Sequence, residues 1–156
     1  MISVEVPGVD TFSIEHVVLD VNGTIALDGT IAGGVPERVA LLTESATVWM
    51  ITADTHGVAA ETAARLGVSV EIITPGAEDA QKTEFVRRLG ARGVVAVGNG
   101  ANDAGMLGEA AIGVCVIGPE GASGRAVAAA DVVVTSIDDA LDLLVSPRRL
   151  VATLRR

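Results

Sequence analysis

The chain has 156 residues, of which 11 are Lys or Arg and 20 are Asp or Glu, so its formal net charge is −9. Hydrophobic residues make up 49% of it, but only 2% of the residues are aromatic. The apolar content excludes a disordered chain, while the negative charge and the scarcity of aromatic rings exclude a typical nucleic-acid-binding surface. We expect a single domain over residues 1–156, with an aliphatic core.

Three features bear on cellular location. Met1–Asp10 has neither the basic start nor the apolar stretch of a signal peptide. No apolar run approaches the roughly 18 residues of a membrane-spanning helix, so no membrane association is expected. The single cysteine, Cys115, cannot form an internal disulfide and lies in an apolar run, where a small buried side chain fits. Together these features predict a cytoplasmic protein.

Two hairpins are predicted near the start of the chain. Val-Glu-Val and Phe-Ser-Ile flank Pro7-Gly8, which indicates a small hairpin at an edge of the sheet. Asp28-Gly29 separates two short β-type segments and is the strongest two-residue hairpin signal. This second hairpin directly follows the first core strand, where an ordinary Rossmann unit does not need one.

Short runs rich in Val and Ile alternate with helix-like segments along the chain. The runs are His16–Leu19, Val48–Ile51, Val68–Ile73, Val94–Val97, Gly113–Ile117 and Val132–Val134. Such runs are typical of strands buried on both faces of a parallel sheet. Their alternation with helices predicts a doubly wound α/β fold, with a Rossmann-like parallel sheet between two layers of helices.

The helices between these runs have recognisable start and stop signals. Pro36 can open a helix in its first turn. Gly67 and Gly90 stand where the segments 57–66 and 79–89 are expected to end. Ser136 followed by Asp139 is typical of a helix start, and Pro147 either ends that helix or opens the next.

Polar residues gather where three of the strands end, which is where open α/β sheets bind ligands. The first strand ends in Asp20–Thr24, the second in Thr52–Asp54 and the fourth in Gly98–Asp103, while Lys82 lies in the helix before that fourth strand. Carboxylate and carbonyl oxygens suit magnesium. A hydroxyl, a lysine and Gly-rich turns suit a phosphoryl group. An Asp at a strand tip can also act as a nucleophile and form an aspartyl-phosphate.

These residues resemble the haloacid-dehalogenase-like phosphohydrolases. DVNGT at 20–24, Thr52, Lys82 and GNGANDAGML at 98–107 are similar to the four motifs of that family and occur in the same order. DVNGT, TADT and GNGxNDxxML together most resemble its small soluble members that are similar to the phosphorylation domain of P-type cation pumps.

The resemblance implies a magnesium-dependent phosphohydrolase or phosphotransferase that forms an aspartyl-phosphate on Asp20. The implied catalytic residues are Asp20, Asn22, Thr52 and Lys82, and the implied Mg²⁺ ligands are Asp20, Asn22 through its backbone carbonyl, Asn99 and Asp103. The implied phosphate contacts are Val21, Gly23, Thr24, Thr52, Ala53 and Lys82. The hairpin at 24–32 would be the flap beside the site, and the intervals between motifs leave no room for a cap domain.

Two asparagines depart from the common pattern of the family. Asn22 stands where most members have an Asp that serves as general acid and base, and an amide cannot do this at neutral pH. Acid–base help contributes about 10²–10⁴-fold, so slow turnover of simple phosphomonoesters is expected. Asn99 stands where the metal motif commonly begins with Asp, so one negative charge is missing there.

Other interpretations remain. Asn22 and Asn99 together also suit a phosphate- or metal-binding regulatory module with little turnover. Gly98-x-Gly100 does not fit a dinucleotide fingerprint, because Asp103 replaces its third Gly and the loop follows a late strand. The substrate class stays open between a phosphorylated metabolite, a nucleotide and a phosphoprotein. An open site also leads us to expect a homo-oligomer. Asp54 and His56 are expected to cap the next helix.

Overall fold

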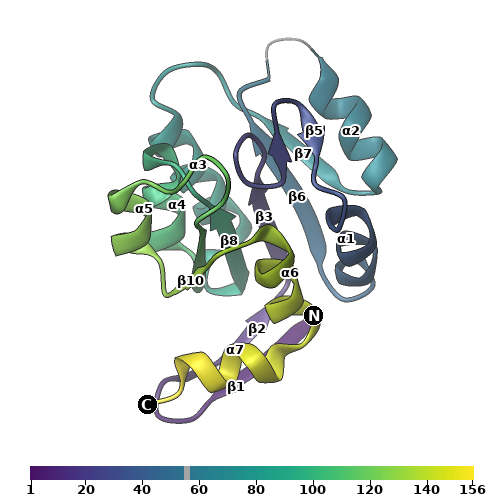
Figure 1. The fold of residues 1–156 in the computed structure, drawn as a ribbon. Helices are drawn as coiled ribbons and strands as arrows, with labels where there is room; N and C mark the ends of the chain where they lie inside the picture. Colours follow the sequence, from purple (N-terminus) through teal and green to yellow (C-terminus); the bar gives the residue numbers. More distant parts are fainter. Residues whose placement is uncertain (55–56) are drawn as a thin grey trace.

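Six strands form the central sheet, in the order β10-β9-β8-β3-β6-β7, and every neighbouring pair is parallel (Figure 1). The computed structural model describes residues 1–54 and 57–156. In chain order the strands are β3 (His16–Asp20), β6 (Thr47–Thr52), β7 (Ser69–Ile72), β8 (Val94–Gly98), β9 (Ile112–Val116) and β10 (Val132–Val134). Each coincides with a predicted strand to within a residue, so the predicted parallel α/β sheet is confirmed.

The aliphatic strands are buried because helices cover both faces of the sheet. Every residue of β8 and β9 is buried, whereas the edge strands β7 and β10 are partly exposed. Alternate residues belong to different cores: Val17 packs in one cluster and Val18 in the other. Cys115 lies in the second cluster and is fully buried, as predicted for a small apolar side chain.

Two groups of helices form the outer layers (Figure 1). The first group is α1 (Val35–Thr43), α2 (Val58–Leu66) and α6 (Ile137–Val145); the second is α3 (Glu78–Leu89), α4 (Ala104–Glu109) and α5 (Gly124–Ala129). Helix α5 was not predicted, because six residues of Gly, Arg, Ala and Val are too short to show a helical period. Its N-cap is Ser123, whose Oγ accepts the N–H of Arg125 at 3.2 Å.

The predicted helix boundaries are largely confirmed. Gly67 and Gly90 are left-handed C-caps of α2 and α3. Ser136 caps α6, since its Oγ accepts the N–H of Asp139 at 3.1 Å. Pro147 opens a further helix, α7 (Pro147–Leu154), which decides the alternative left open at that residue.

Both predicted hairpins are present, but one lies in a different place. The flap consists of β4 (Ala26–Leu27) and β5 (Thr30–Ile31), and the residues that join them, Asp28 and Gly29, have positive φ angles of 50° and 80°. The first hairpin, β1 (Ile2–Val6) and β2 (Asp10–Ile14), was expected at an edge of the main sheet. It forms a separate two-stranded sheet instead.

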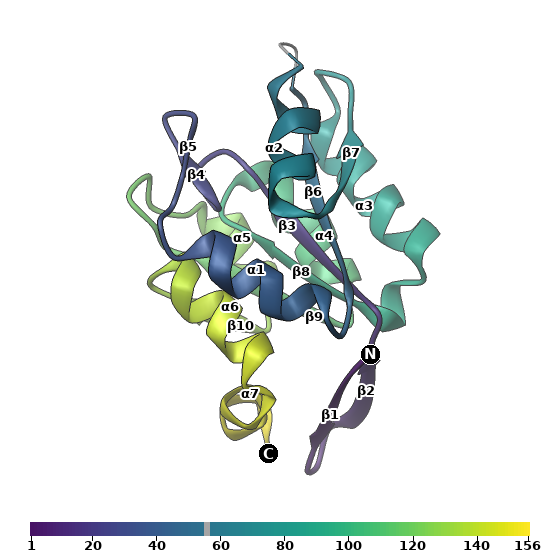
Figure 2. The same ribbon diagram turned by 90° about the vertical axis from the view of Figure 1, so that its right-hand side faces the viewer.

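Helix α7 explains this separation. The alternating apolar residues of β1 need cover, and α7 packs against that strand, with Leu150 fully buried (Figure 2). The β1–β2 hairpin and α7 therefore lie at the lower end of the molecule in Figure 2, while the flap and α2 stand at the upper end. The candidate site is at the upper end, where the parallel strands finish.

The described chain between β3 and β8 contains the flap, α1, β6, α2, β7 and α3, and these elements form no cap domain. Within residues 1–54 and 57–156, no helix has the length and apolar character needed to cross a membrane.

Candidate active site

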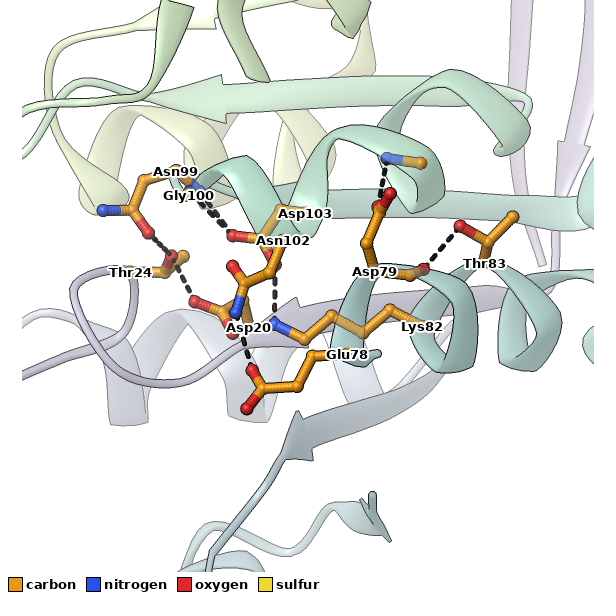
Figure 3. Close-up of polar contacts among 11 residues, drawn as sticks. Asp20, Thr24, Glu78, Asp79, Lys82, Thr83, Asn99, Gly100, Asn102 and Asp103 are labelled. Carbon is orange, nitrogen blue, oxygen red and sulfur yellow. Dashed lines mark hydrogen bonds and ion pairs between the residues drawn. The ribbon is translucent and has the colours of Figure 1, made fainter. Parts of the chain in front are cut away.

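A buried lysine between two aspartates forms the centre of the site (Figure 3). Lys82 Nζ lies 2.7 Å from Asp20 Oδ1 and 2.7 Å from Asp103 Oδ1. Asp20 is the last residue of β3, Lys82 is on α3, and Asp103 ends a short 3₁₀ turn, Ala101–Asp103, after β8. Three residues far apart in sequence thus meet at the carboxyl end of the sheet, and all three are buried.

Asp103 is held in place by the turn that precedes it. Its Oδ2 accepts the backbone N–H groups of Asn99 at 2.9 Å and Gly100 at 2.8 Å. Only glycine fits at position 98, because a Cβ there would lie 2.6 Å from the Asp103 carboxyl carbon. Although Asp103 precedes α4, its carboxylate does not cap that helix. Both of its oxygens instead orient Lys82 and the loop after β8.

The second oxygen of Asp20 faces a different set of atoms. Thr24 Oγ1 lies 3.1 Å from Asp20 Oδ2 and 3.1 Å from Asn99 Oδ1. The amide Nδ2 of Asn99 donates to the carbonyl of Gly121 at 3.4 Å, which turns Oδ1 of Asn99 toward Thr24. A hydroxyl has one proton, so it can donate to only one of its two oxygen neighbours at a time. The surroundings of Asp20 Oδ2 are therefore rich in acceptor oxygens.

Burial and charge shift the protonation equilibria of this group. Burial and the nearby charge of Asp103 together raise the pKa of Asp20 to about 6, although Lys82 opposes the rise. Burial by itself lowers the pKa of Lys82, but the charges of Asp20 and Asp103 outweigh this, so the pKa is raised overall. Lys82 therefore stays protonated at neutral pH, whereas Asp20 is a carboxylate held at a cost in free energy.

The position of Lys82 depends on helix α3, which is held on both sides of this residue. Asp79, one turn earlier, accepts the backbone N–H of Gly105 at 2.7 Å, which links the start of α3 to α4. Phe85 and Val86 anchor the next turn in the core. Sequence reasoning did not single out Asp79, because its role depends on a backbone amide 26 residues away.

A cavity of about 360 Å³ lies next to Lys82, which forms part of its lining. Its lining includes the predicted residues Asp20, Asn22, Thr52, Ala53, Lys82 and Asn99. It also includes Glu78, Glu120, Gly100 and Asn102. Asn102 donates to Glu78 at 2.7 Å, and Glu120 lies over Gly23, whose missing Cβ would be 2.1 Å from Glu120 Oε2.

The two glutamates were not predicted as site residues. Glu78 precedes Lys82 by one helical turn, and this i, i+4 spacing was a usable signal. Nothing in the sequence indicates that the side chain of Glu120 reaches Gly23.

Three predicted phosphate contacts, Val21, Gly23 and Thr24, are not in the lining of this cavity. Gly23 and Thr24 donate their backbone N–H groups inside the flap turn, to Ala26 O at 2.7 Å and Val21 O at 3.2 Å. Both amides are engaged in the flap turn, while the hydroxyl of Thr24 lies beside Asp20. Val21 lines a neighbouring, more apolar pocket.

The residues after Thr52 are only partly described. Asp54 Oδ2 accepts the N–H of Ala59 at 2.8 Å near the start of α2, in agreement with its predicted capping role. His56 lies outside the described residues.

Comparison with known proteins identifies the family. The haloacid dehalogenase-like hydrolase family matches residues 2–111, more than half of the chain. The chain belongs to this family. Its fold is the Rossmann-like core of these hydrolases, without a cap.

Two relatives come from Methanocaldococcus jannaschii, and both are uncharacterized proteins. One is 50% identical over 62 residues, covering 40% of this chain and 67% of the relative. The other is 51% identical over 39 residues, covering 25% of this chain and 89% of the relative.

Solved structures share the fold at low sequence identity. A cobalt-bound deoxy-D-mannose-octulosonate 8-phosphate phosphatase from Haemophilus influenzae has a TM-score of 0.70 at 13% identity, covering 88% of this chain and 90% of the other. A 3-deoxy-D-manno-octulosonate 8-phosphate phosphatase from Moraxella catarrhalis, with magnesium, phosphate and KDO, has a TM-score of 0.65 at 20% identity, covering 91% and 94%. The catalytic domain of the CPx-ATPase CopB-B has a TM-score of 0.62 at 18% identity, covering 76% and 47%.

Proposed function

We propose that this chain is a magnesium-dependent phosphohydrolase or phosphotransferase that forms an aspartyl-phosphate on Asp20. The observation that carries the proposal is the contact of Lys82 Nζ with Asp20 and Asp103, at 2.7 Å each, below an open cavity. A carboxylate that attacks an anionic phosphate needs positive charge beside it. The family match and the magnesium and phosphate in the Moraxella structure support the same chemistry.

The donor set beside Asp20 suits Mg²⁺. Asp20 Oδ2 and Asn99 Oδ1 both approach the single hydroxyl of Thr24 at 3.1 Å, so one of the two lacks a proton donor in that direction. Hard oxygen ligands of this kind are those that Mg²⁺ prefers. We assign its binding to the side chains of Asp20 and Asn99 and the backbone carbonyl of Asn22. When bound, Mg²⁺ neutralises charge on the phosphoryl oxygens.

Asp103 has a different role in this proposal from the direct metal contact first expected. Both of its oxygens already accept hydrogen bonds, from Lys82 on one side and from the Asn99 and Gly100 amides on the other. We assign Asp103 to positioning Lys82 and the Asn99 loop.

The reaction then has two steps. An oxygen of Asp20 attacks phosphorus, and the bond from phosphorus to the leaving group breaks. Water next attacks the phosphorus, the bond to Asp20 breaks, and phosphate leaves. Lys82 stabilises charge on the Asp20 side, while Thr52, whose side chain borders the cavity, donates its hydroxyl to a phosphoryl oxygen.

Asn22 makes both steps slow for simple phosphomonoesters. Its amide can neither protonate a leaving oxygen nor deprotonate the attacking water, so solvent must do both. The proposal accordingly includes a long-lived phosphoenzyme, with residues 1–156 acting as one catalytic domain. Cytoplasmic location and a homo-oligomer remain predictions.

The test is to trap the phosphoenzyme. The protein is incubated with acetyl phosphate and Mg²⁺, quenched in acid and examined by intact-protein mass spectrometry before and after hydroxylamine. We expect one acid-stable, hydroxylamine-labile phosphate on the natural protein and on the control Asp28→Asn, which changes an exposed flap carboxylate. Asp20→Asn should carry none.

Two results would contradict the proposal. Phosphorylation of the Asp20→Asn variant would show that the nucleophile is wrongly assigned. Absence of both phosphoenzyme and phosphate release, across a panel of aryl and acyl phosphates with Mg²⁺, would favour the regulatory module with little turnover.

A further inference from the structure

A second cavity shares a wall with the candidate active site. It has a volume of about 330 Å³, and Asn22, Thr52 and Ala53 line both it and the cavity above Lys82. Its other walls come from the flap, β6 and α2. The flap and α2 both stand at the upper end of the molecule in Figure 2, where the parallel strands finish. A molecule bound at Asp20 through its phosphate would therefore have this pocket beside it.

The chemistry of the pocket differs from that of the active-site cavity. Besides the shared Ala53, its apolar lining residues are Val21, Ala26, Ile31, Met50, Val58 and Ala59. Among the described residues, the only charged side chain in its lining is Asp54, which already accepts the N–H of Ala59. Lys and Arg are absent from the described lining, so a carboxylate or a second phosphate would lose water there without gaining a cation.

The active-site cavity adds to this discrimination. Glu78 and Glu120 lie on its wall, and the one cation in its described lining, Lys82, is shared between two aspartates. A leaving group with a negative charge would face Glu78 and Glu120 in the active-site cavity and Asp54 in the second pocket.

We propose that the pocket beneath the flap binds the leaving group of the substrate, and that the substrate is a phosphomonoester with a compact, uncharged and largely apolar leaving group. This inference rests on the proposed function, since it takes the phosphate to bind at Asp20. The volume is at the lower end of the range of about 300–1,000 Å³ for small-molecule sites, which fits an aliphatic chain or a single ring.

The experiment compares inhibition constants, which require only a slow but measurable turnover of a reporter substrate. Alkylphosphonates, which are not hydrolysed, compete against a generic aryl phosphate in the presence of Mg²⁺. Butylphosphonate and 3-phosphonopropionate have tails of similar size, but only the second carries a carboxylate. We expect the inhibition constant of butylphosphonate to be at least about tenfold lower. From methyl to butyl, each added methylene should lower it by up to about fourfold.

Two pairs of variants on α2 test whether the alkyl chain of the phosphonate binds in this pocket. Ala59 lines the pocket, whereas its neighbour Ala60 is exposed and does not. Ala59→Leu should remove the preference for butyl over methyl and leave the constant for methylphosphonate within about twofold. Ala60→Leu should behave as the natural protein.

The second pair adds a cation and does not depend on filling a buried space. Val58 lines the pocket but is 56% exposed, so Val58→Lys is tolerated sterically. It should lower the inhibition constant of 3-phosphonopropionate at least threefold, while Ala60→Lys, which adds the same charge to the same helix, should not.

The outcomes separate this inference from the function on which it rests. If the aryl phosphate is hydrolysed but the two phosphonates bind equally, or the carboxylate binds better, the leaving-group assignment is wrong and the proposed function stands. If Ala59→Leu keeps the butyl preference, the tail lies elsewhere and the assignment is also wrong. If the natural protein neither hydrolyses nor is phosphorylated by any donor, both proposals fail.

Discussion

Lys82 and Arg38 are each held between two aspartates, but in very different surroundings. Lys82 is 2% exposed and contacts Asp20 and Asp103, both buried. Arg38 is 25% exposed and contacts Asp142 at 2.7 Å and Asp138 at 3.6 Å, where α1 packs against α6. The charges are the same in kind and number, so burial is the main difference between the two groups.

The difference shows in opposite pKa shifts. Burial raises the pKa of Asp20 to about 6 despite Lys82. The hydrogen bond from Arg38 lowers the pKa of Asp142, because little burial opposes it there. The partly exposed ion pair links two helices without raising the free energy of its carboxylates. The buried Asp20 carboxylate is destabilised, so binding a cation or forming a covalent bond to phosphorus would lower its free energy.

The largest contrast is expected from removing each cation. Lys82→Met leaves Asp20 and Asp103 buried without a counter-charge, which should destabilise the metal-free protein by roughly 3–5 kcal/mol. It should also remove phosphoenzyme formation. Arg38→Met should change stability much less and leave turnover unchanged, because the side chains of Asp138 and Asp142 are 43% and 32% exposed. Urea denaturation and the acetyl phosphate assay measure both, and similar effects of the two variants would contradict the comparison.

The next effect concerns the residue two positions after Asp20. Asn22→Asp restores a proton donor and acceptor next to the buried group, and should raise phosphomonoester turnover at least tenfold, on the order of 10²–10⁴ at most. Steady-state phosphate release measures it. Asn102→Asp, which adds the same charge to the same cavity, should give no such gain. An unchanged or lower rate in Asn22→Asp would refute our account of this residue.

The pH dependence of stability should have opposite signs in the two groups. With a folded pKa of about 6 against an ordinary value of 3.8, Asp20 loses its proton in the unfolded chain first. Its contribution to the free energy of unfolding therefore falls as pH rises from about 4 to 6. Asp142, with a lowered pKa, contributes stability that is lost as pH falls through its folded pKa.

Unfolding without Mg²⁺ at a series of pH values tests this. Asp20→Asn should be more stable than the natural protein near pH 7, by about 1–3 kcal/mol, and the gap should close near pH 4. Asp142→Asn should be less stable near pH 7. Mg²⁺ should stabilise the natural protein and not Asp20→Asn. If the difference in the free energy of unfolding between Asp20→Asn and the natural protein does not change with pH, the pKa of Asp20 is not raised by folding.

The smallest effect is expected from Glu120, at the edge of the active-site cavity. Glu120 is exposed, so Glu120→Gln removes a solvated charge and should lower the inhibition constant of inorganic phosphate by about two- to threefold at low salt. Asp138→Asn, which removes a carboxylate from the Arg38 group, should leave that constant unchanged. Equal effects of the two variants would indicate that only the overall charge of the protein matters.

Much of the fold was predictable because its signals are local. Val- and Ile-rich runs, Pro147, Ser136 and Asp28-Gly29 act on the residues next to them, and the strands and most helix ends were correctly predicted. Helix α5 and the position of the β1–β2 hairpin were not. The first is too short for a period, and the second depends on α7, at the other end of the chain.

The candidate site divides in the same way. The sequence by itself determined which residues stand at the strand ends, since Asp20, Thr52 and Asn99 follow directly from strand boundaries. Only the tertiary structure decided which groups the side chains and amides of the site contact. Both oxygens of Asp103 accept hydrogen bonds, from Lys82 and from two backbone amides. The Gly23 and Thr24 amides donate within the flap turn, and Glu120 lies over Gly23. The reason is physical. Strand ends are set by neighbours in sequence, whereas burial, pKa and hydrogen-bond partners depend on groups that meet only when the sheet is assembled.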